Sequence, residues 1–269
     1  MSRLPVVTAV IVSYNTRELL LAGLASLRGV TCPLEVVVVD NASADGSAEA
    51  VRAQYPDVYL IASPENGGFS KANNLGIRAA DAAYVLVLNS DAAVQPGAVE
   101  AMVDLLHRRR DVAIVGPRTL SPDGTIQVSF GPDLTPWNEL RQRRLVHGVK
   151  ARRPWALRRA HALASVEHEP AWVSGSCFLA RRDVLEEVGL FDEGFFLYEE
   201  DVDLCVRVRK AGYRVVFTPT ATVVHHLGRS METASTRARE EYKKSHLRFY
   251  EKHNHPLWAR LLRLWSARG

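Results

Sequence analysis

The stretch that decides the fold runs from Val6 to Asp40 and reads "VVTAVIVSYNTRELLLAGLASLRGVTCPLEVVVVD". Its two ends, Val6–Ser13 and Leu34–Asp40, are rich in β-branched residues and are typical of buried parallel strands. Between them, leucines at positions 19, 20, 24 and 27 are spaced for one face of a helix, and Gly29 ends it. A strand, a helix and a second strand in this order predict a parallel sheet covered by helices.

The same alternation continues along the first half of the chain. Further strands are predicted over Val58–Ser63 and Ala83–Asp91, and further helices over Ser47–Gln54 and Ser70–Ala80. The first ~115 residues therefore predict a doubly wound α/β sheet. The second half is less regular, and three apolar runs predict strands that complete the sheet: Ala171–Arg182, Tyr213–Phe217 and Ala221–His226.

Length and composition limit the class of protein. With 269 residues and 47% hydrophobic content, the chain can bury the core of one large α/β domain with an extension, which excludes disorder as a general description. The net charge of +4 is mildly basic and unevenly distributed. Three cysteines without C-x-x-C spacing indicate neither disulfides nor a zinc cage and favour a reducing, cytosolic setting.

No segment has the pattern of a signal peptide or a membrane span. The apolar run at the start of the sequence is short and passes directly into a polar turn, which favours a buried strand. No stretch approaches the roughly 18 to 20 uncharged apolar residues that cross a bilayer. We expect a cytoplasmic protein, soluble or peripheral.

Polar residues follow three of the predicted strands. They are Ser13–Tyr14–Asn15, Asp40–Asn41 and Asn89–Ser90–Asp91. Ligands of such sheets bind at the carboxyl ends of the strands. The first strand lacks a following G-x-G-x-x-G, so a dinucleotide is disfavoured, but Asp40 can accept an N–H from a uracil or thymine ring. The alternative for Asp40 is a simple turn at the end of its strand.

Two other stretches suggest phosphate and metal binding. In "ENGGFSKANNLG" (Glu65–Gly76), glycines permit close approach of a backbone, and Lys71 at a helix start suits a phosphate; Asn73 could instead bond a neighbouring loop. Asp91 offers a carboxylate to a hard divalent cation, unless it caps the helix expected near Pro96. Of the tandem histidines 225 and 226, at most one can face the same site.

Acidic residues are concentrated in "FFLYEEDVDLCVRVRKAGYRVVF", from Phe195 to Phe217. Apolar spacing predicts a helix from about Asp201 to Ala211, closed by Gly212. Acids in a first helical turn complement the helix dipole, which explains one or two of the four carboxylates without any chemistry. A reaction that needs a base is the alternative.

Two basic segments suggest contact with a surface. The arginine-rich stretch Arg141–His161 is predicted to be mobile or surface-seeking, and the C-terminal "HPLWARLLRLWSARG" interleaves leucine and tryptophan with arginine. A basic amphipathic stretch of this kind can lie on an anionic membrane. The alternative is a tail that packs on its own domain.

Taken together, these motifs resemble the inverting nucleotide-sugar glycosyltransferases of family 2, which have the GT-A fold, and most closely their bacterial rhamnosyltransferase-like branch. The resemblance extends from Thr8 to Ser230. It implies a GT-A domain over residues 1–230, with a nucleotide-binding half (about 1–115) and an acceptor-side half (about 116–230), and a C-terminal helical extension over 231–269. The motifs are "VIVSYN", "VVVVDNASADGS", "NGGFSKANNLG", "LVLNSDAAV", "GSCFLARRDVLEEVGLFDEGFFLYEEDVDLCVR" and "HHLGRS".

The resemblance also implies roles for individual residues. Asp201 would be the catalytic base, with Glu200 as the second candidate and Asp203 as a capping or orienting residue. Asp91 and His225 would hold Mn²⁺ or Mg²⁺, although the metal-binding D-x-D pattern begins here with Asn89. Trp172 and Gly175 would lie on the acceptor side. The nucleotide would contact Ser13, Tyr14, Asn15, Asp40, Asn66, Gly68, Lys71, Asn73, Asn89 and Ser90.

The expected activity is transfer of a sugar from dTDP-rhamnose or a UDP-sugar to a hydroxyl of a glycan or lipid-linked acceptor, in cell-surface polysaccharide synthesis. The expected location is the cytoplasm, with peripheral binding to an anionic membrane surface at the inner face of the cell membrane. No nucleic-acid partner is expected. The alternatives are a sugar-nucleotide nucleotidyltransferase, which would need a glycine-rich basic loop where "SYNTRE" stands, and a non-catalytic nucleotide-sugar-binding module.

Overall fold

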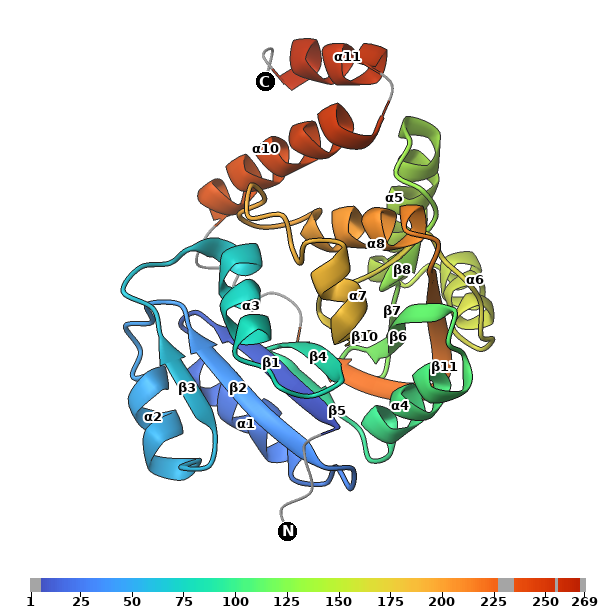
Figure 1. Cartoon of the computed structure of the whole chain (residues 1–269). Coiled ribbons are helices and arrows are strands. Elements are labelled where there is room, and N and C mark those ends of the chain that lie inside the picture. The colour runs from blue at the N-terminus through green and yellow to red at the C-terminus, as the bar shows by residue number, and fades with distance from the viewer. Residues whose placement is uncertain (1–5, 227–234, 255, 267–269) are drawn as a thin grey trace.

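The computed structural model describes residues 6–226, 235–254 and 256–266. A curled mixed sheet runs through the molecule, and helices cover both of its faces (Figure 1). The strand order is β3-β2-β1-β4-β10-β6-β11-β5, and β7 pairs with β6 beside this path. The expected α/β fold, a sheet flanked by helices, is therefore confirmed.

The first half of the sheet is parallel. It consists of β1 (Val7–Ser13), β2 (Leu34–Asp40), β3 (Tyr59–Ala62) and β4 (Tyr84–Asn89). Alternate residues of β2 enter different apolar clusters, because successive side chains of a strand point to opposite faces: Val38 joins one cluster, and Val37 and Val39 join another. The helices of this half are α1 (Arg17–Leu27), α2 (Ser47–Gln54), α3 (Gly68–Arg78) and α4 (Ala98–Arg108).

The second half adds strands of both directions. Strand β10 (Cys177–Arg181) lies antiparallel between β4 and β6 (Val112–Leu120), β11 (Arg214–His225) runs parallel to β6, and β5 (Ala92–Val94) runs antiparallel to β11. Short strands β7 (Ile126–Gln127), β8 (Phe130–Gly131) and β9 (Trp172–Val173) complete the set. Helices α7 (Arg182–Glu187) and α8 (Glu200–Lys210) follow β10.

Three predictions for this half were wrong in detail. The run Ala171–Arg182 is two strands, because β9 pairs with β8 in a separate sheet while β10 pairs with β4 and β6. The runs Tyr213–Phe217 and Ala221–His226 are one strand, β11, in which an irregularity between Thr218 and Thr222 accommodates Pro219. Strand β6 was not predicted.

The arginine-rich segment Arg141–His161, which was expected to be mobile or surface-seeking, is mostly helical. Helix α5 (Pro136–Lys150) begins at Thr135, whose hydroxyl accepts from the Asn138 N–H, and α6 (Pro154–Leu163) packs against α5. Their contact is apolar and consists of Leu145, Val149, Ala156 and Ala160. The basic residues of this segment therefore lie on a pair of packed helices.

Helices α10 (Ser235–His253) and α11 (Pro256–Ser266) form the C-terminal extension, at the top of Figure 1. Phe249 and Tyr250 of α10 share an apolar cluster with Phe195, Val202 and Ala259. The expected domain boundary at residue 230 lies outside the described residues. Among the residues described, no helix combines the length and apolar character that a membrane crossing requires.

Candidate active site

The carboxyl ends of β1 and β4 meet through a chain of hydroxyl groups. Ser13 Oγ lies 3.1 Å from Thr16 Oγ1, and Thr16 Oγ1 donates to Ser90 Oγ at 2.7 Å. The end of β2 joins them, because the Asn41 N–H donates to the Ser13 carbonyl at 2.8 Å. The predicted strand-end residues therefore come together at one edge of the sheet.

Asp40 is buried at this edge. Its Oδ2 accepts from the Ser43 N–H at 3.1 Å, whereas its Oδ1 has no hydrogen-bond partner in the described part of the chain. Asn15, with φ of 53°, bonds to the loop after β2 through its backbone N–H and its side-chain oxygen. Tyr14 beside it is exposed. An unpaired buried carboxylate oxygen needs a donor, and a ligand N–H can supply one.

The glycine-rich stretch packs against the acidic loop of the second half. Asn66 Oδ1 accepts from the Asn41 side chain at 2.9 Å and from the Gly68 N–H at 3.0 Å. At Gly68 φ is +83°, and a Cβ there would lie 2.5 Å from the Phe196 carbonyl oxygen. Only glycine permits this approach.

Lys71 and Asn73 lie in the first two turns of α3, just after Gly68. The Lys71 ammonium is half-exposed and lies 3.2 Å from Glu65 Oε1. Asn73 is buried and donates to the Phe69 carbonyl at 3.0 Å, while its Oδ1 has no partner within the described residues. Lys71 would have to leave Glu65 to reach a phosphate.

Gln127 fixes the position of the proton on the His225 ring. The Gln127 amide nitrogen donates to the His225 carbonyl at 2.7 Å, and a carbonyl can only accept. The atom 3.0 Å from His225 Nδ1 is therefore the Gln127 oxygen, so Nδ1 carries hydrogen. In a neutral ring, Nε2 then retains its lone pair and can bind a metal.

Nε2 of His225 faces the turn after β4. It lies 3.1 Å from Asp91 Oδ1 and 3.4 Å from the Asn89 amide nitrogen, and the His225 and Asp91 side chains are only 10% and 9% exposed. A lone pair and a carboxylate oxygen this close repel each other unless a proton or a metal cation lies between them. Carboxylate and neutral imidazole fit a divalent ion such as Mn²⁺.

Two protein groups do not complete a coordination shell. Among the described residues, no group of three or more His, Cys, Asp or Glu side chains could hold an ion. Hard divalent cations accept ligand phosphate oxygens and water at the remaining positions. The pair of Asp91 and His225 therefore suits a metal carried together with a phosphate. The neighbouring His226 is exposed, as alternation along a strand predicts.

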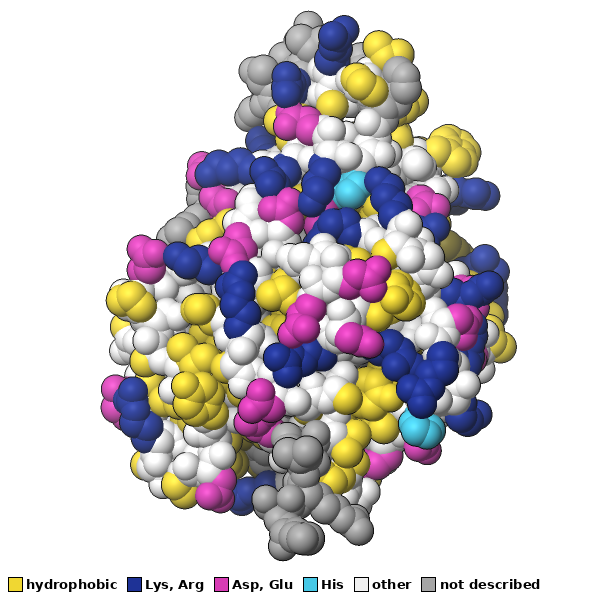
Figure 2. Space-filling view, viewed as in Figure 1, with side chains coloured by type: hydrophobic (Ala, Val, Ile, Leu, Met, Phe, Trp, Pro, Cys, Tyr) yellow, Lys and Arg dark blue, Asp and Glu magenta, His cyan; other side chains and the backbone are white. Residues whose placement is uncertain are grey.

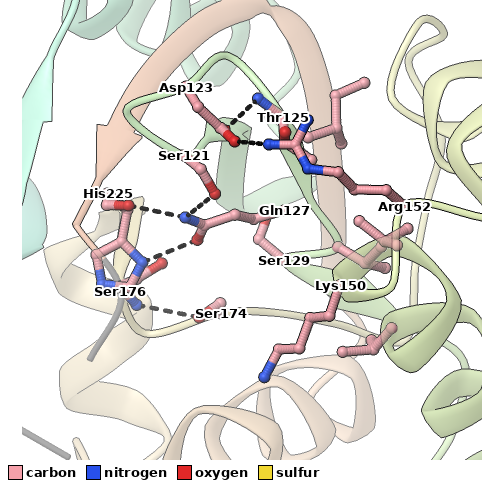
Figure 3. A pocket seen from close by; sticks show the side chains of 14 residues that line it. Ser121, Asp123, Thr125, Gln127, Ser129, Lys150, Arg152, Ser174, Ser176 and His225 are labelled. Atoms are coloured by element: carbon pink, nitrogen blue, oxygen red, sulfur yellow. Dashed lines mark hydrogen bonds and ion pairs between the residues drawn. The ribbon is translucent and has the colours of Figure 1, made fainter. Parts of the chain in front are cut away.

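A cavity of about 390 Å³ adjoins His225 and is drawn in Figure 3. Gln127 lies between His225 and Ser121 there, and the cavity extends to Ser174, Ser176 and Lys150. Its lining is partly aliphatic, and the polar part consists of hydroxyl and basic side chains together with Asp123 and Gln127. The cavity can accept a polar ligand beside the candidate metal position.

Asp201 lies at the start of α8 and is held by two backbone donors. Its Oδ2 accepts from the Gly175 N–H at 2.7 Å, and its Oδ1 accepts from the Val202 N–H at 2.8 Å. Burial raises the pKa of Asp201 to about 6; the bond from Gly175 opposes this shift, and the charge of Glu199 adds to it. A carboxyl with such a pKa is mostly ionised at neutral pH and can accept a proton.

The other acids have different environments. Glu200 is buried, its Oε2 has no partner among the described residues, and burial followed by the charge of Asp201 raises its pKa well above the ordinary range. Asp203 is fully buried and bonds to Arg207, His253 and Lys252. Despite its burial, these partners hold the pKa of Asp203 below its ordinary value. Asp203 therefore joins α8 to α10, whereas the surroundings of Glu200 disfavour its ionised form.

A second cavity, of about 230 Å³, opens at Asp201. The indole of Trp172 forms part of it and donates to the Pro132 carbonyl at 2.9 Å. Gly175 connects the surroundings of the two cavities: its N–H bonds to Asp201, which lines the second cavity, and its sequence neighbours Ser174 and Ser176 line the first. The remaining lining of the second cavity is aromatic, polar and aliphatic and includes Tyr198, Tyr242, Arg143, Gln142, Leu134 and Val202.

Comparison with known proteins identifies the family. A family model for glycosyl transferase family 2 matches residues 8–189. The chain belongs to glycosyl transferase family 2. It is 34% identical to N-acetylglucosaminyl-diphospho-decaprenol L-rhamnosyltransferase of Mycobacterium tuberculosis, over 98% of this chain and 90% of that one. The protein is thus a glycosyltransferase, similar to a rhamnosyltransferase.

Solved structures agree on the fold. A mannosyltransferase from Pyrobaculum calidifontis in complex with GDP-Man and Mn²⁺ has a TM-score of 0.63 and 21% identity, over 97% of this chain and 69% of that one. GalNAc-T7 with UDP, GalNAc and Mn²⁺ has a TM-score of 0.61 and 18% identity, over 84% of this chain and 44% of that one. This glycosyltransferase has the GT-A fold.

Sequence reasoning missed several residues of the site. Gln127 reaches His225 from 98 positions away, and His246 of α10 lies 3.1 Å from Glu199 Oε1 and 3.4 Å from Glu139 Oε2. The one available signal was the regular spacing of Tyr242, His246 and Tyr250 along α10, which puts three ring side chains on one face. Expected residues of the motif after His226 lie outside the described residues.

Proposed function

We propose that this glycosyltransferase moves a sugar from a nucleoside-diphosphate sugar to an acceptor hydroxyl by a single displacement with inversion, and that Asp201 is the base. The observation that carries the proposal is the carboxylate of Asp201, which borders a cavity, is held by two N–H groups and has a pKa of about 6. A hydroxyl is a poor nucleophile, so a positioned carboxylate must remove its proton as it attacks the anomeric carbon.

We assign the donor site to the edge formed by β1, β2 and β4. The unpaired Oδ1 of Asp40 suits the ring N–H of uracil or thymine. The hydrogen-bonded hydroxyl groups of Ser13, Thr16 and Ser90 extend from this edge toward Asp91, and we place the diphosphate along them. The rhamnosyltransferase relative favours dTDP-rhamnose as the donor over UDP-sugars.

We assign Asp91 and His225 as ligands of Mn²⁺ or Mg²⁺. When bound, the ion neutralises the negative charge that develops on the leaving diphosphate. Gln127 keeps the His225 ring in the orientation and tautomer that ligation requires. The presence of Mn²⁺ in two structural neighbours agrees with this assignment.

The acceptor is assigned to the cavity at Asp201. Trp172, Tyr198 and Tyr242 supply aromatic faces on which a sugar ring can pack, while Asn138 and Gln142 supply hydrogen bonds. The name of the mycobacterial relative specifies a sugar on a diphospho-decaprenol, so a lipid-linked glycan in cell-surface polysaccharide synthesis is the favoured acceptor. Such an acceptor would place the enzyme at the inner face of the cell membrane.

The test is release of nucleoside diphosphate from a panel of dTDP- and UDP-sugars, with and without a polyprenyl-diphosphate-linked N-acetylglucosamine acceptor. We expect acceptor-dependent release from dTDP-rhamnose, with Mn²⁺ or Mg²⁺ required. Release of pyrophosphate from a sugar phosphate and a nucleoside triphosphate would indicate the nucleotidyltransferase alternative. Binding of nucleotide sugar without release under any condition would indicate the binding-module alternative.

A further inference from the structure

We propose that the outer face of α5, together with the start of α11, docks on an anionic lipid bilayer and so presents the cavity at Asp201 to a lipid-borne acceptor. Docking on the bilayer concerns a surface and its partner. Presentation of the cavity to a lipid-borne acceptor rests on the proposed function.

Helix α5 carries an exposed face in which large apolar and basic side chains are mixed. Trp137 is 65% exposed and Leu140 is 60% exposed, and both Arg141 and Arg144 are exposed as well. Their positions, 137, 140, 141 and 144, follow the i, i+3, i+4, i+7 spacing of one helical face. Most of the Trp137 and Leu140 side chains is thus left uncovered by the described protein, and a partner surface would cover them.

The opposite face of α5 forms a wall of the cavity that contains Asp201. The cavity is lined on this side by Asn138, Glu139, Gln142 and Arg143. These positions lie on the helix face opposite the exposed residues named above. One helix thus separates the candidate base from the exposed apolar and basic residues by its own thickness. A ligand anchored in a surface on the outer side would reach the cavity around the end of α5.

The start of α11 extends the same surface. The Asn254 side chain, just before α11, donates to the Leu134 carbonyl, just before α5, at 3.0 Å, so the two helices begin close together. Leu257 and Trp258, in the first turn of α11, are 58% and 45% exposed. Figure 1 shows α11 beyond the end of α10, near the upper end of α5.

The charge of this region selects an anionic partner. Between Pro136 and Leu163 the sequence has eight basic residues and one acid, Glu139, whose side chain is 11% exposed and bonds to Tyr250 and Arg143 inside the protein. Figure 2 shows Lys and Arg side chains gathered across the upper part of the molecule, with hydrophobic side chains beside them. A bilayer of anionic lipids satisfies both features, because its headgroups attract arginine and its interface takes tryptophan and leucine. A soluble polyanion offers no apolar layer for Leu140 or Leu257.

The test measures co-sedimentation of the full chain, without substrates, with vesicles of phosphatidylcholine alone or mixed with phosphatidylglycerol. We expect binding to the anionic vesicles that weakens at high salt. Replacing Arg141 and Arg144 by Gln should weaken binding about tenfold or more, since each basic residue near such a surface favours binding severalfold. Replacing Trp137 and Leu140 by Ser should weaken it to a similar extent without lowering the thermal midpoint.

Matched controls replace exposed residues elsewhere. Tyr59→Ser removes an equally exposed aromatic from β3, and Arg52→Gln with Arg108→Gln removes two charges from α2 and α4; all three should leave binding unchanged. No sedimentation at low salt, equal binding of wild type and both α5 variants, or binding to heparin but not to vesicles would overturn the proposal.

Transfer assays separate this surface from the reaction itself. Both α5 double variants should retain the wild-type rate on a water-soluble acceptor and lose rate on the acceptor embedded in anionic vesicles. Vesicle binding without any transfer by wild type would refute the proposed function and leave the docking surface intact. Transfer by a wild-type protein that does not bind vesicles would refute the docking surface and leave the proposed function intact.

Discussion

Acidification from about pH 7 to about pH 5 should lower kcat about tenfold, if the ionised form of Asp201 is the base. Burial gives this carboxyl a pKa of about 6. At one unit above that value about 90% of the groups are ionised, and at one unit below about 10% are, which gives the tenfold ratio. A carboxyl with an ordinary Asp pKa would remain almost fully ionised at both pH values, and kcat would hardly change.

The assay is steady-state release of nucleoside diphosphate with donor and acceptor both saturating, at half-unit steps of pH. Calorimetric donor affinity and the thermal midpoint at each pH separate proton transfer from binding and unfolding. The residual activity of Asp201→Asn should lack the acidic limb. A flat kcat between the two pH values in the wild-type enzyme would refute the assignment of a raised pKa to the base.

Three further outcomes follow from the geometry. Glu200→Gln should raise the thermal midpoint at neutral pH by at least about 2 °C and change it little below about pH 4. The reason is that the raised pKa of Glu200 in the folded state stabilises the fold only at low pH, and this stability is lost as the pH rises. Gln127→Leu should weaken Mn²⁺ binding about 10- to 100-fold in a titration with nucleoside diphosphate, since it frees the ring of His225; unchanged affinity would contradict the tautomer argument. Gly68→Ala should lower the midpoint well below that of the control Gly124→Ala, which has a similar positive φ but no atom near the added carbon.

The nucleotide side of the fold could be predicted because its signals are local. Strands β1 to β4 are short apolar runs, and each of β1, β2 and β3 is followed by a turn and a helix. The second half could not be predicted to the same extent. The run 171–182 is divided into two strands because its first part pairs with β8 and its second part pairs with β4. No pattern within the run identifies these partners. Strand β6 contains Gly116 and Pro117, which signal a turn, yet both residues pair with β11 and so remain in the sheet.

The candidate site divides in the same way. Asp40 and Asp91 were found from the rule that ligands bind at the carboxyl ends of strands, which needs only the strand order. Gln127 and His246 were missed because each acts through a contact across a long sequence separation. The sequence left Asp201 and Glu200 as neighbouring candidates, and their hydrogen bonds differ: both Asp201 oxygens accept a backbone N–H, whereas Glu200 Oε2 has no donor among the described residues.

The most direct test of the central claim compares kcat of Asp201→Asn and Glu200→Gln, with donor affinity measured on the same samples. We predict that Asp201→Asn lowers kcat by roughly 10² to 10⁴ with donor affinity unchanged, since the amide keeps the shape but cannot accept the proton. Glu200→Gln should cost far less, because glutamine is neutral and burial already disfavours the ionised form of Glu200. An active Asp201→Asn beside an inactive Glu200→Gln would contradict the account and transfer the role of base to Glu200.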